Sequence, residues 1–389
     1  MRQIARFLVA TTFTALAIAA WFDHGIGETV HPSGYVVYVG TYTRQQSRGI
    51  YAFRFDPAAG KAATVGLAAE AENPSFLAIH PNRQFLYAVN EISNFQGRRA
   101  GSISAYRVGK RPAMLQFINR MSTQGDSPCH VTVDRTGIAL FVANYGAGSV
   151  ASIPIMKDGS LSDASSLVEH AGSSVNPQRQ QGPHAHEVVL SPDGRLGLVP
   201  DLGLDKVFVY GFDRARIAFS TPPVFAAKLE PGSGPRHLAF RPDGKYTYVV
   251  NELRSTVTVF AYSRKEGSLT ELQTASTLPK DFAGTSTCAE IAVHPNGRFL
   301  YASNRGHDSI AVFAINRSNG TVVLQGQVPT QGKTPRHFAI DPTGGWLLAA
   351  NQGSNNVVVF RIDARTGQLA PTGEFVVVPS PSCIIFVAS

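Results

Sequence analysis

The chain has 389 residues, of which 43% are hydrophobic and 16% charged, and it contains 36 glycines and 24 prolines. A chain of this length can bury a large core, and its many turn-forming residues favour an all-β protein. The formal net charge is +8, but lysines and arginines are scattered instead of forming a basic run, which argues against a nucleic-acid partner and favours small anionic ligands.

The first segment is typical of a secretory signal peptide. Arg2 and Arg6 precede an apolar stretch that ends in small residues between Ala15 and Ala20. We therefore expect residues 1–20 to be a signal peptide and the protein to be periplasmic or secreted, without stable membrane insertion after cleavage. The apolar run is short for a membrane span, and an uncleaved N-terminal anchor stays open as the alternative.

One hairpin pattern recurs about every 50 residues. It reads NPSFLAIHPNRQFLYAVNE from Asn73, SPCHVTVDRTGIALFVANY from Ser127 and GPRHLAFRPDGKYTYVVNE from Gly234, with related units near residues 184, 287 and 334. Each hairpin is followed by a third apolar segment and then, after a turn, by a fourth. Repeats of this length with four short strands are the signature of a β-propeller.

A seventh unit is divided between the two ends of the chain. YVVYVGTYT, from Tyr35, matches the second strand of the pattern, and PSCIIFV, from Pro381, matches the first strand. We predict a single all-β domain over residues 33–389, a seven-bladed β-propeller with four antiparallel strands per blade. The C-terminal strand completes the N-terminal blade and so leaves no open sheet edge there.

Polar side chains gather at one end of the predicted hairpins. In an antiparallel pair the start of strand one lies beside the end of strand two, so the polar ends of all blades should converge at the mouth of a central channel. Residues that break the repeat are the best candidates for catalysis, and they are His186, Arg236, Glu252 and Arg305. The same positions in other blades, and one neighbour, supply predicted substrate-binding residues: His184, His130, His237, His337, Arg336, Glu290, Asn304 and Glu91.

Two alternatives accompany these assignments. Because His130, His237 and His337 occupy one repeat position, a structural role is an open alternative for them. His184 and His186 in HAH could ligate a metal, but no matching pair of ligands follows, and the three cysteines have no paired spacing. We therefore expect neither a metal nor another cofactor.

The stretches QGPHAHEVVLSPDGR and GPRHLAFRPDGKYTYVVNE resemble the seven-bladed lactonase family, which includes propeller-type 6-phosphogluconolactonases and the fungal carboxymuconate lactonizing enzyme. The likeness extends over nearly all of the chain after the predicted signal peptide. In the lactonizing relatives a His, an Arg, a Glu and a second Arg are the proposed active residues. The resemblance places them at His186, Arg236, Glu252 and, more loosely, Arg305. The signal peptide departs from a cytosolic sugar-phosphate role and puts 6-phosphogluconolactone itself in doubt.

Three functions are consistent with these residues and with the resemblance. The first is metal-independent hydrolysis of a sugar-acid or other anionic lactone by a monomer, with His186 or Glu252 as general base and the two arginines holding the anion and the oxyanion. The second is a muconate-type cycloisomerase, which needs similar residues. The third is a non-catalytic exported propeller that binds a ligand or protein.

Overall fold

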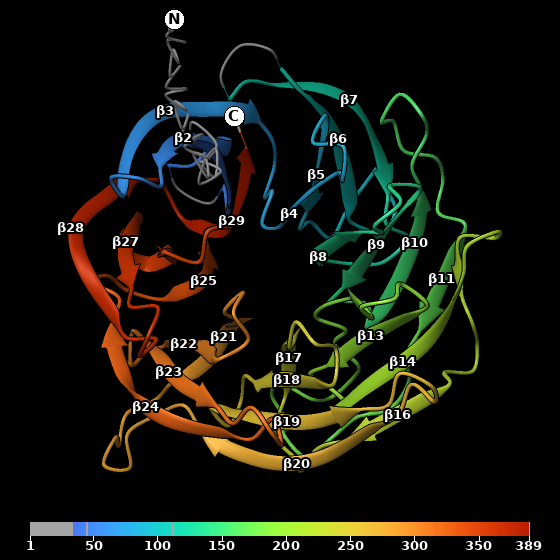
Figure 1. Cartoon of the computed structure of the whole chain (residues 1–389). Coiled ribbons are helices and arrows are strands. Elements are labelled where there is room, and N and C mark those ends of the chain that lie inside the picture. The colour runs from blue at the N-terminus through green and yellow to red at the C-terminus, as the bar shows by residue number, and fades with distance from the viewer. Residues whose placement is uncertain (1–33, 44–45, 110–112, 389) are drawn as a thin grey trace, which may run out of the picture. The chain divides into compact units, whose positions relative to one another are not determined.

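The computed structural model describes residues 34–43, 46–109 and 113–388, and these form seven antiparallel sheets around a central axis (Figure 1). The signal-peptide prediction for residues 1–20 falls outside the described residues and stays a prediction. We number the sheets as blades 1 to 7 in chain order and give the strands of each from the innermost outward.

The first three blades have the following strands. Blade 1 contains β29 (Pro381–Ala388), β1 (Tyr35–Thr41), β2 (Gly49–Asp56) and β3 (Lys61–Glu70). Blade 2 contains β4 (Leu77–Ile79), β5 (Phe85–Asn90), β6 (Ser102–Val108) and β7 (Leu115–Ser122). Blade 3 contains β8 (Pro128–Val133), β9 (Ala139–Asn144), β10 (Ser149–Pro154) and β11 (Ser166–Glu169).

Blade 4 departs from the pattern. It contains β12 (Val189–Leu190), β13 (Leu196–Asp201), β14 (Lys206–Asp213), and an outer edge divided into β15 (Ala218–Phe219) and β16 (Phe225–Lys228). Its innermost strand is short because the chain before β12 leaves the ladder: Ala185 pairs with Asp201, and regular pairing resumes at Val189.

The last three blades are regular. Blade 5 contains β17 (Pro235–Phe240), β18 (Tyr246–Asn251), β19 (Thr256–Tyr262) and β20 (Leu269–Ser276). Blade 6 contains β21 (Thr287–Val293), β22 (Phe299–Arg305), β23 (Ser309–Ile315) and β24 (Val322–Pro329). Blade 7 contains β25 (Pro335–Ile340), β26 (Trp346–Asn351), β27 (Asn356–Ile362) and β28 (Leu369–Val377), and the 3-10 turn η1 (Gln352–Ser354) joins β26 to β27.

The predicted fold class is therefore confirmed, including the way the ring closes. β29 pairs antiparallel with β1, from Tyr35 opposite Ala388 to Thr41 opposite Pro381. The tight turns have the predicted chemistry: in blade 5, Gly244 has φ of +68° and donates its N–H to the Arg241 carbonyl at 2.8 Å. A residue with a side chain would be strained in that left-handed conformation.

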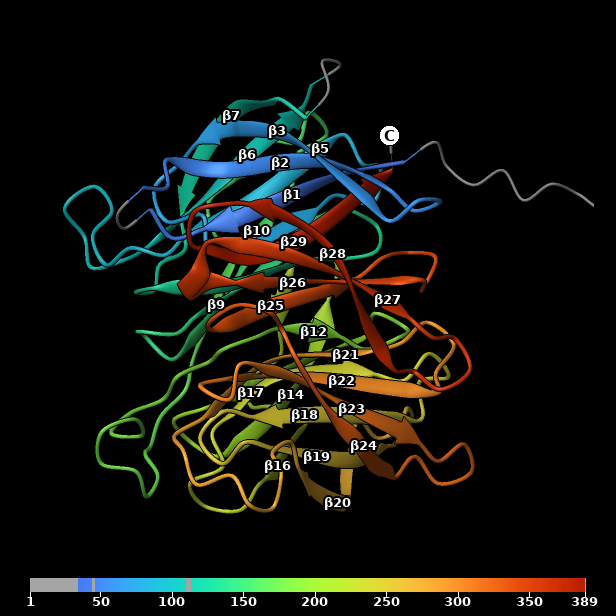
Figure 2. The ribbon, with the colours of Figure 1, turned by 90° about the vertical axis from the view of Figure 1, so that its left-hand side faces the viewer.

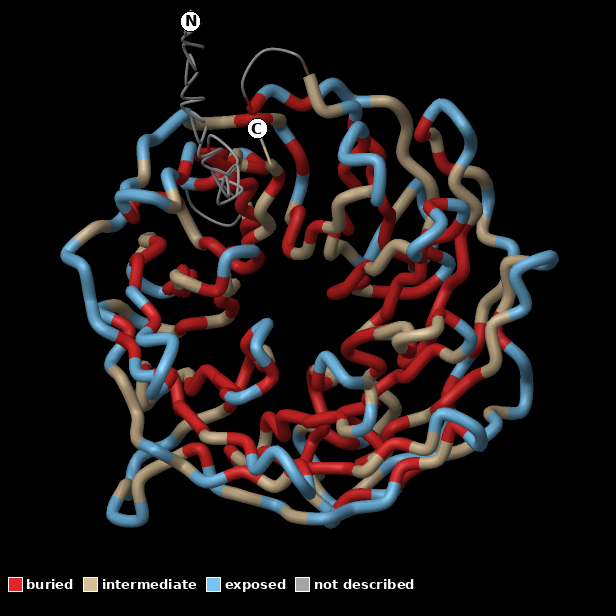
Figure 3. Tube along the Cα trace, in the orientation of Figure 1, coloured by how far each residue is buried: buried red, intermediate tan, exposed pale blue. Residues whose placement is uncertain are grey.

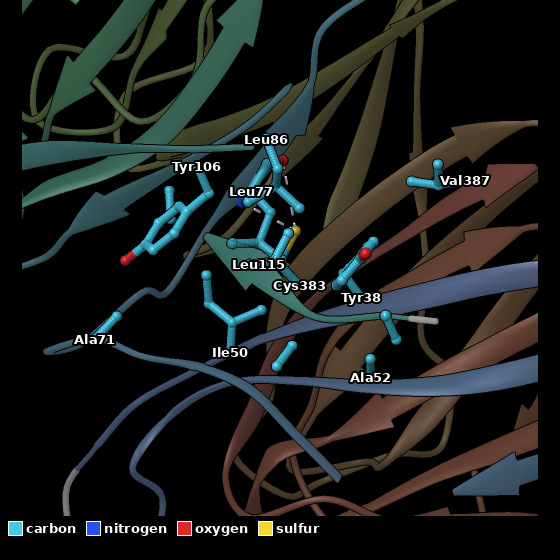
Figure 4. Packing of buried hydrophobic residues seen from close by; sticks show 13 residues of the cluster. Tyr38, Ile50, Ala52, Ala71, Leu77, Leu86, Tyr106, Leu115, Cys383 and Val387 are labelled. Carbon is cyan, nitrogen blue, oxygen red and sulfur yellow. Dashed lines mark hydrogen bonds between the residues drawn. The ribbon is translucent and has the colours of Figure 1, made fainter. Parts of the chain in front are cut away.

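The core lies between blades. Seven hydrophobic clusters fill the seven interfaces between neighbouring blades, one cluster per interface. The inner strands are therefore buried on both faces, as β5 and β9 are along their whole length, whereas the outermost strands are largely exposed (Figure 3). Figure 4 shows the interface between blades 1 and 2, where Cys383 of β29 accepts a hydrogen bond from Leu77 N at 3.4 Å. Among the described residues no helix has the length and apolar character needed to cross a membrane.

Candidate active site

The polar side chains at the start of the innermost strands are positioned by irregular strand pairing. In blades 3, 5 and 7 the register between strands one and two shifts at the second residue, so Cys129, Arg236 and Arg336 have no partner in the ladder. A bulge of this kind redirects side chains that would otherwise alternate between faces. Consecutive residues can then meet near the axis: Arg236 Nη1 lies 3.3 Å from His237 Nε2.

Glu252 is the centre of the site, because three guanidinium groups converge on its carboxylate. Its Oε2 lies 2.9 Å from Arg305 Nη2 and 3.1 Å from Arg236 Nε. Its Oε1 accepts a hydrogen bond from Arg179 Nη2 at 2.7 Å. Arg236 and Arg305 are held further by backbone carbonyls, since Arg236 donates to Ala289 O at 2.6 Å and Arg305 to Cys288 O at 2.8 Å.

These contacts set the charges of the group. Burial alone would raise the pKa of Glu252, but Arg305, Arg236 and Arg179 outweigh it and lower that pKa to about 2. Burial, with repulsion from Arg336 and Arg305, lowers the pKa of Arg236 to about 10. At neutral pH the cluster therefore contains one carboxylate and three cations.

His186 faces the same pocket as an imidazole held neutral. It is buried, and burial together with the charge of Arg236 lowers its pKa well below 6.5. Cys129 Sγ lies 3.6 Å from its Nδ1, and the ring of Tyr145 packs edge-on against it at 5.4 Å. The pocket has a volume of about 310 Å³ and is lined from blades 2 to 7: Glu91, Cys129, Tyr145, Arg179, His186, Glu252, Thr287, Arg305 and Arg336.

A second polar chain of contacts borders this pocket. Arg336 Nη2 donates to Tyr42 Oη at 2.7 Å, and Tyr42 Oη donates to Glu91 Oε2 at 2.7 Å. Ser75 Oγ also donates to Glu91 Oε2, at 2.5 Å. Arg336 and Glu91 line both the first pocket and an adjoining pocket of about 560 Å³.

The repeat-position histidines form a layer around Phe76. The ring of Phe76 lies 4.3 Å from that of His130, 5.9 Å from that of His237 and 5.5 Å from that of His337. Glu290 Oε2 joins two of them, at 3.0 Å from His237 Nδ1 and 3.4 Å from His337 Nε2.

This layer favours neutral side chains. Burial lowers the pKa of His337 to about 4 and those of His130 and His237 well below 6.5. Burial also raises the pKa of Glu290, and that of Glu187 well above 4.5. Glu187 accepts a hydrogen bond from Leu238 N at 2.6 Å. The layer packs and hydrogen-bonds within the protein, as the structural alternative for these histidines predicts.

The structure brings the four predicted catalytic residues together: His186, Glu252 and Arg305 line the pocket, and Arg236 pairs with Glu252. Of the eight predicted binding residues, Glu91 and Arg336 line the pocket and the other six do not. Asn304 is fully buried, and its amide is engaged by Thr277 and Ser309, outside the lining of both pockets. The placement of Asn304 as a substrate-binding residue is corrected on this ground, because its polar atoms already bond to the chain. His184 stacks on the ring of Tyr145 at 4.4 Å, and its Nδ1 lies 2.9 Å from Tyr145 O, so it contacts a residue of the pocket lining without lining the pocket itself.

Sequence reasoning missed Arg179, Tyr42 and Tyr145 as site residues. Arg179 lies in the connection from β11 to β12, which has no counterpart in the other repeats and projects from one side of the ring (Figure 2). The only sequence signal is the wider spacing of the repeats there. Within the described residues no three His, Cys, Asp or Glu side chains are grouped as a metal site would require.

Comparisons with known proteins agree with this fold. A family model described as lactonase, seven-bladed β-propeller, matches residues 36–386. The chain is 38% identical over 304 residues to the 6-phosphogluconolactonase of Bacillus subtilis strain 168, covering 78% of this chain and 84% of that protein. It is 36% identical over 307 residues to the 6-phosphogluconolactonase of Formosa agariphila, covering 78% and 85%. The structure of the Pseudomonas aeruginosa periplasmic gluconolactonase matches with a TM-score of 0.85 and 38% identity, over 92% of this chain and 99% of that one.

Proposed function

The chain belongs to the seven-bladed β-propeller lactonase family, and from this premise we propose that it hydrolyses an anionic lactone, such as that of a sugar acid, in the pocket around Glu252. As a lactonase it converts a cyclic ester and water into a hydroxy acid. One observation supports the location above all: the guanidinium groups of Arg179, Arg305 and Arg336 and the neutral imidazole of His186 line one pocket of about 310 Å³.

The proposed base is His186. A neutral imidazole has a lone pair that can accept a proton from water, whereas the Glu252 carboxylate is occupied by three cations and its lowered pKa makes it a weak base. Water oxygen bonds to the lactone carbonyl carbon as His186 takes the proton. The ring C–O bond then breaks, and the protonated imidazole returns a proton to the leaving alkoxide.

The proposed stabiliser of the tetrahedral oxyanion is Arg305, with Arg236 behind it. Both guanidiniums are fixed in place by Glu252 and by the carbonyls of Cys288 and Ala289, so they need little reorganisation when charge develops. Because these cations can supply the electrostatic stabilisation, we propose that the reaction needs no metal. Dialysis against a chelator should then leave turnover unchanged, and loss of turnover that is restored by a divalent cation would refute this part.

A lactone panel tests the function. Purified protein is assayed with glucono-δ-lactone, 6-phosphoglucono-δ-lactone, a glucarolactone and an aliphatic lactone, with spontaneous opening subtracted. We expect turnover of at least one anionic lactone, a loss of about 10² to 10⁴-fold in kcat for His186→Ala, and a loss of about 10² to 10³-fold for Arg305→Ala. Turnover by both variants at the wild-type rate would refute the proposed site. Turnover of a muconate instead, or tight binding without turnover, would favour the cycloisomerase or the binding protein.

We also propose that the protein is exported. Arg2, Arg6 and the apolar stretch that follows support this, as does the likeness to a periplasmic gluconolactonase. Intact mass and cell fractionation of the full chain test it: we expect a product shortened near residue 20 in the periplasmic or extracellular fraction. A full-length protein confined to the cytoplasm would contradict export.

A further inference from the structure

Arg179 differs from the other two arginines on Glu252 in how it is held. Arg236 has an exposed side-chain fraction of 3% and Arg305 of 14%, and each also donates to a backbone carbonyl. Arg179 has an exposed fraction of 37%. Its guanidinium bonds to Glu252 and, at 3.2 Å, to Tyr145 Oη, and within the described residues it has no backbone carbonyl partner. Arg179 is therefore the arginine that can change partners at least cost.

The backbone beside Arg179 is fixed, which confines the movement to its side chain. Gln180 is fully buried, and its Nε2 donates to Leu202 O at 2.8 Å. Its Oε1 accepts the N–H of Asn176 at 3.0 Å, and the Gln180 N–H bonds to the Asn176 carbonyl at 2.8 Å. These contacts hold the connection against blade 4 and place the Arg179 guanidinium at the pocket.

The charges around the pocket favour an incoming anion. Arg179, Arg305 and Arg336 line the pocket and Arg236 pairs with Glu252, so four arginines accompany two glutamates (Glu91 and Glu252), which leaves an excess of two positive charges. If Arg179 leaves Glu252, the carboxylate keeps Arg236 and Arg305 as partners. A substrate anion that replaces Glu252 as the partner of Arg179 therefore leaves no buried charge without a counter-ion.

We propose that Arg179 is the specificity residue for anionic lactones: the anionic substituent of the substrate takes the Arg179 guanidinium from Glu252, while Arg236 and Arg305 stay in place. This inference rests on the proposed lactonase function. It separates two tasks within one cluster, since Arg179 selects the charged substrate and Arg305 acts on the reacting carbonyl of any lactone that binds.

Two lactones with the same ring test the assignment, one neutral (glucono-δ-lactone) and one anionic (6-phosphoglucono-δ-lactone). For Arg179→Gln we expect KM for the anionic lactone to rise by about 10- to 100-fold, the range expected for a lost charge-assisted hydrogen bond. KM for the neutral lactone and both kcat values should stay within about threefold. Arg179→Lys keeps the charge and loses the planar geometry, so its KM for the anionic lactone should lie between those of the wild type and Arg179→Gln. Equal effects on the two lactones, or none on either, would overturn the proposal.

Arg254→Gln is the matched control. It removes an exposed arginine of blade 5 that pairs with Glu230 and does not line the pocket. Both KM values should match those of the wild type. A rise for the anionic lactone equal to that of Arg179→Gln would show that general charge, and not Arg179, selects the substrate.

A binding experiment separates failure of this inference from failure of the lactonase function. Calorimetry compares gluconate with 6-phosphogluconate on the wild type and on Arg179→Gln, and it needs no turnover. We expect the wild type to prefer 6-phosphogluconate by at least about tenfold and the variant to lose that preference. A wild type with no preference, or a variant that keeps it, refutes the role of Arg179 whether or not any lactone is opened.

Discussion

At the scale of single residues, the proposed mechanism depends on a histidine that stays neutral. Burial, Arg236 and His237 all oppose protonation of His186, so its pKa lies well below 6.5. A lowered pKa means that the imidazole keeps its lone pair at mildly acidic pH and loses it only as the pH falls through that lowered value.

We therefore predict that the acidic limb of kcat/KM lies below pH 6.5. The measurement is a pH–rate profile from about pH 4 to 8 with correction for spontaneous opening, and residual activity of His186→Ala should lack this limb. A limb at or above pH 6.5, or one that persists in His186→Ala, would assign the base to another group.

Glu252 carries a second prediction at this scale. Replacing it with Gln leaves the buried guanidinium of Arg236 without its counter-ion, so we expect Glu252→Gln to lower the free energy of unfolding by roughly 3–5 kcal/mol. Urea unfolding measures the change. Glu230→Gln is the control, because its ion pair with Arg254 is exposed and should matter by less than about 1 kcal/mol. Similar midpoints for the two variants would mean that Glu252 has no part in holding the arginines.

At the scale of elements, some residues at the strand ends contribute to the pocket and others hold the blades together, and the sequence pattern does not distinguish the two. Arg236 sits at a bulge and contacts Glu252, whereas Asn304, near the end of β22, bonds to Thr277, the residue that follows β20. Both residues occupy the predicted convergence point, and only the direction of the side chain distinguishes them. Repeat spacing predicts position along the axis, but not this direction.

Asn304→Ala should accordingly affect stability and not catalysis. The Thr277 hydroxyl and carbonyl would lose buried partners at 2.6 and 3.1 Å, which costs about 1–3 kcal/mol. Thermal or urea unfolding would register the loss, and KM for a responsive lactone should not change. A raised KM with unaltered stability would return Asn304 to the binding site.

The strands were predictable where the repeat is regular. The apolar hairpins of blades 5 and 7 have the expected strands, because neighbours cover both of their faces. In blade 4 the first strand shrinks to β12, since the chain around His186 leaves the ladder to reach the pocket. Arg179 was beyond prediction for a related reason: its position depends on a unique connection whose path is fixed by Gln180, and no repeat gives a template for it.

At the scale of the whole molecule, stability depends on a ring in which every blade packs against two others. β29 contributes to both interfaces of blade 1, with Cys383 and Val387 toward blade 2 and Ile384 toward blade 7. Blade 1 therefore owes its innermost strand to residues more than 300 positions away from the rest of its sheet.

Ile384→Ala tests this dependence. Loss of a buried side chain at the interface of blades 1 and 7 should lower the free energy of unfolding by roughly 2–5 kcal/mol. The control is Val377→Ala on β28, where the side chain is exposed and the change should be within about 0.5 kcal/mol. If chemical unfolding gave equal midpoints for the two, closure by β29 would not be a source of stability.

The pairing of β1 with β29 also determines when the ring can close during synthesis. β1 is made before the other strands, yet its inner hydrogen-bonding edge waits for a partner that follows all of them in the chain. A nascent chain cannot close the ring until its final strand has been synthesised. Under the proposed export, this late closure would leave the ring open while the chain passes through a translocation pore.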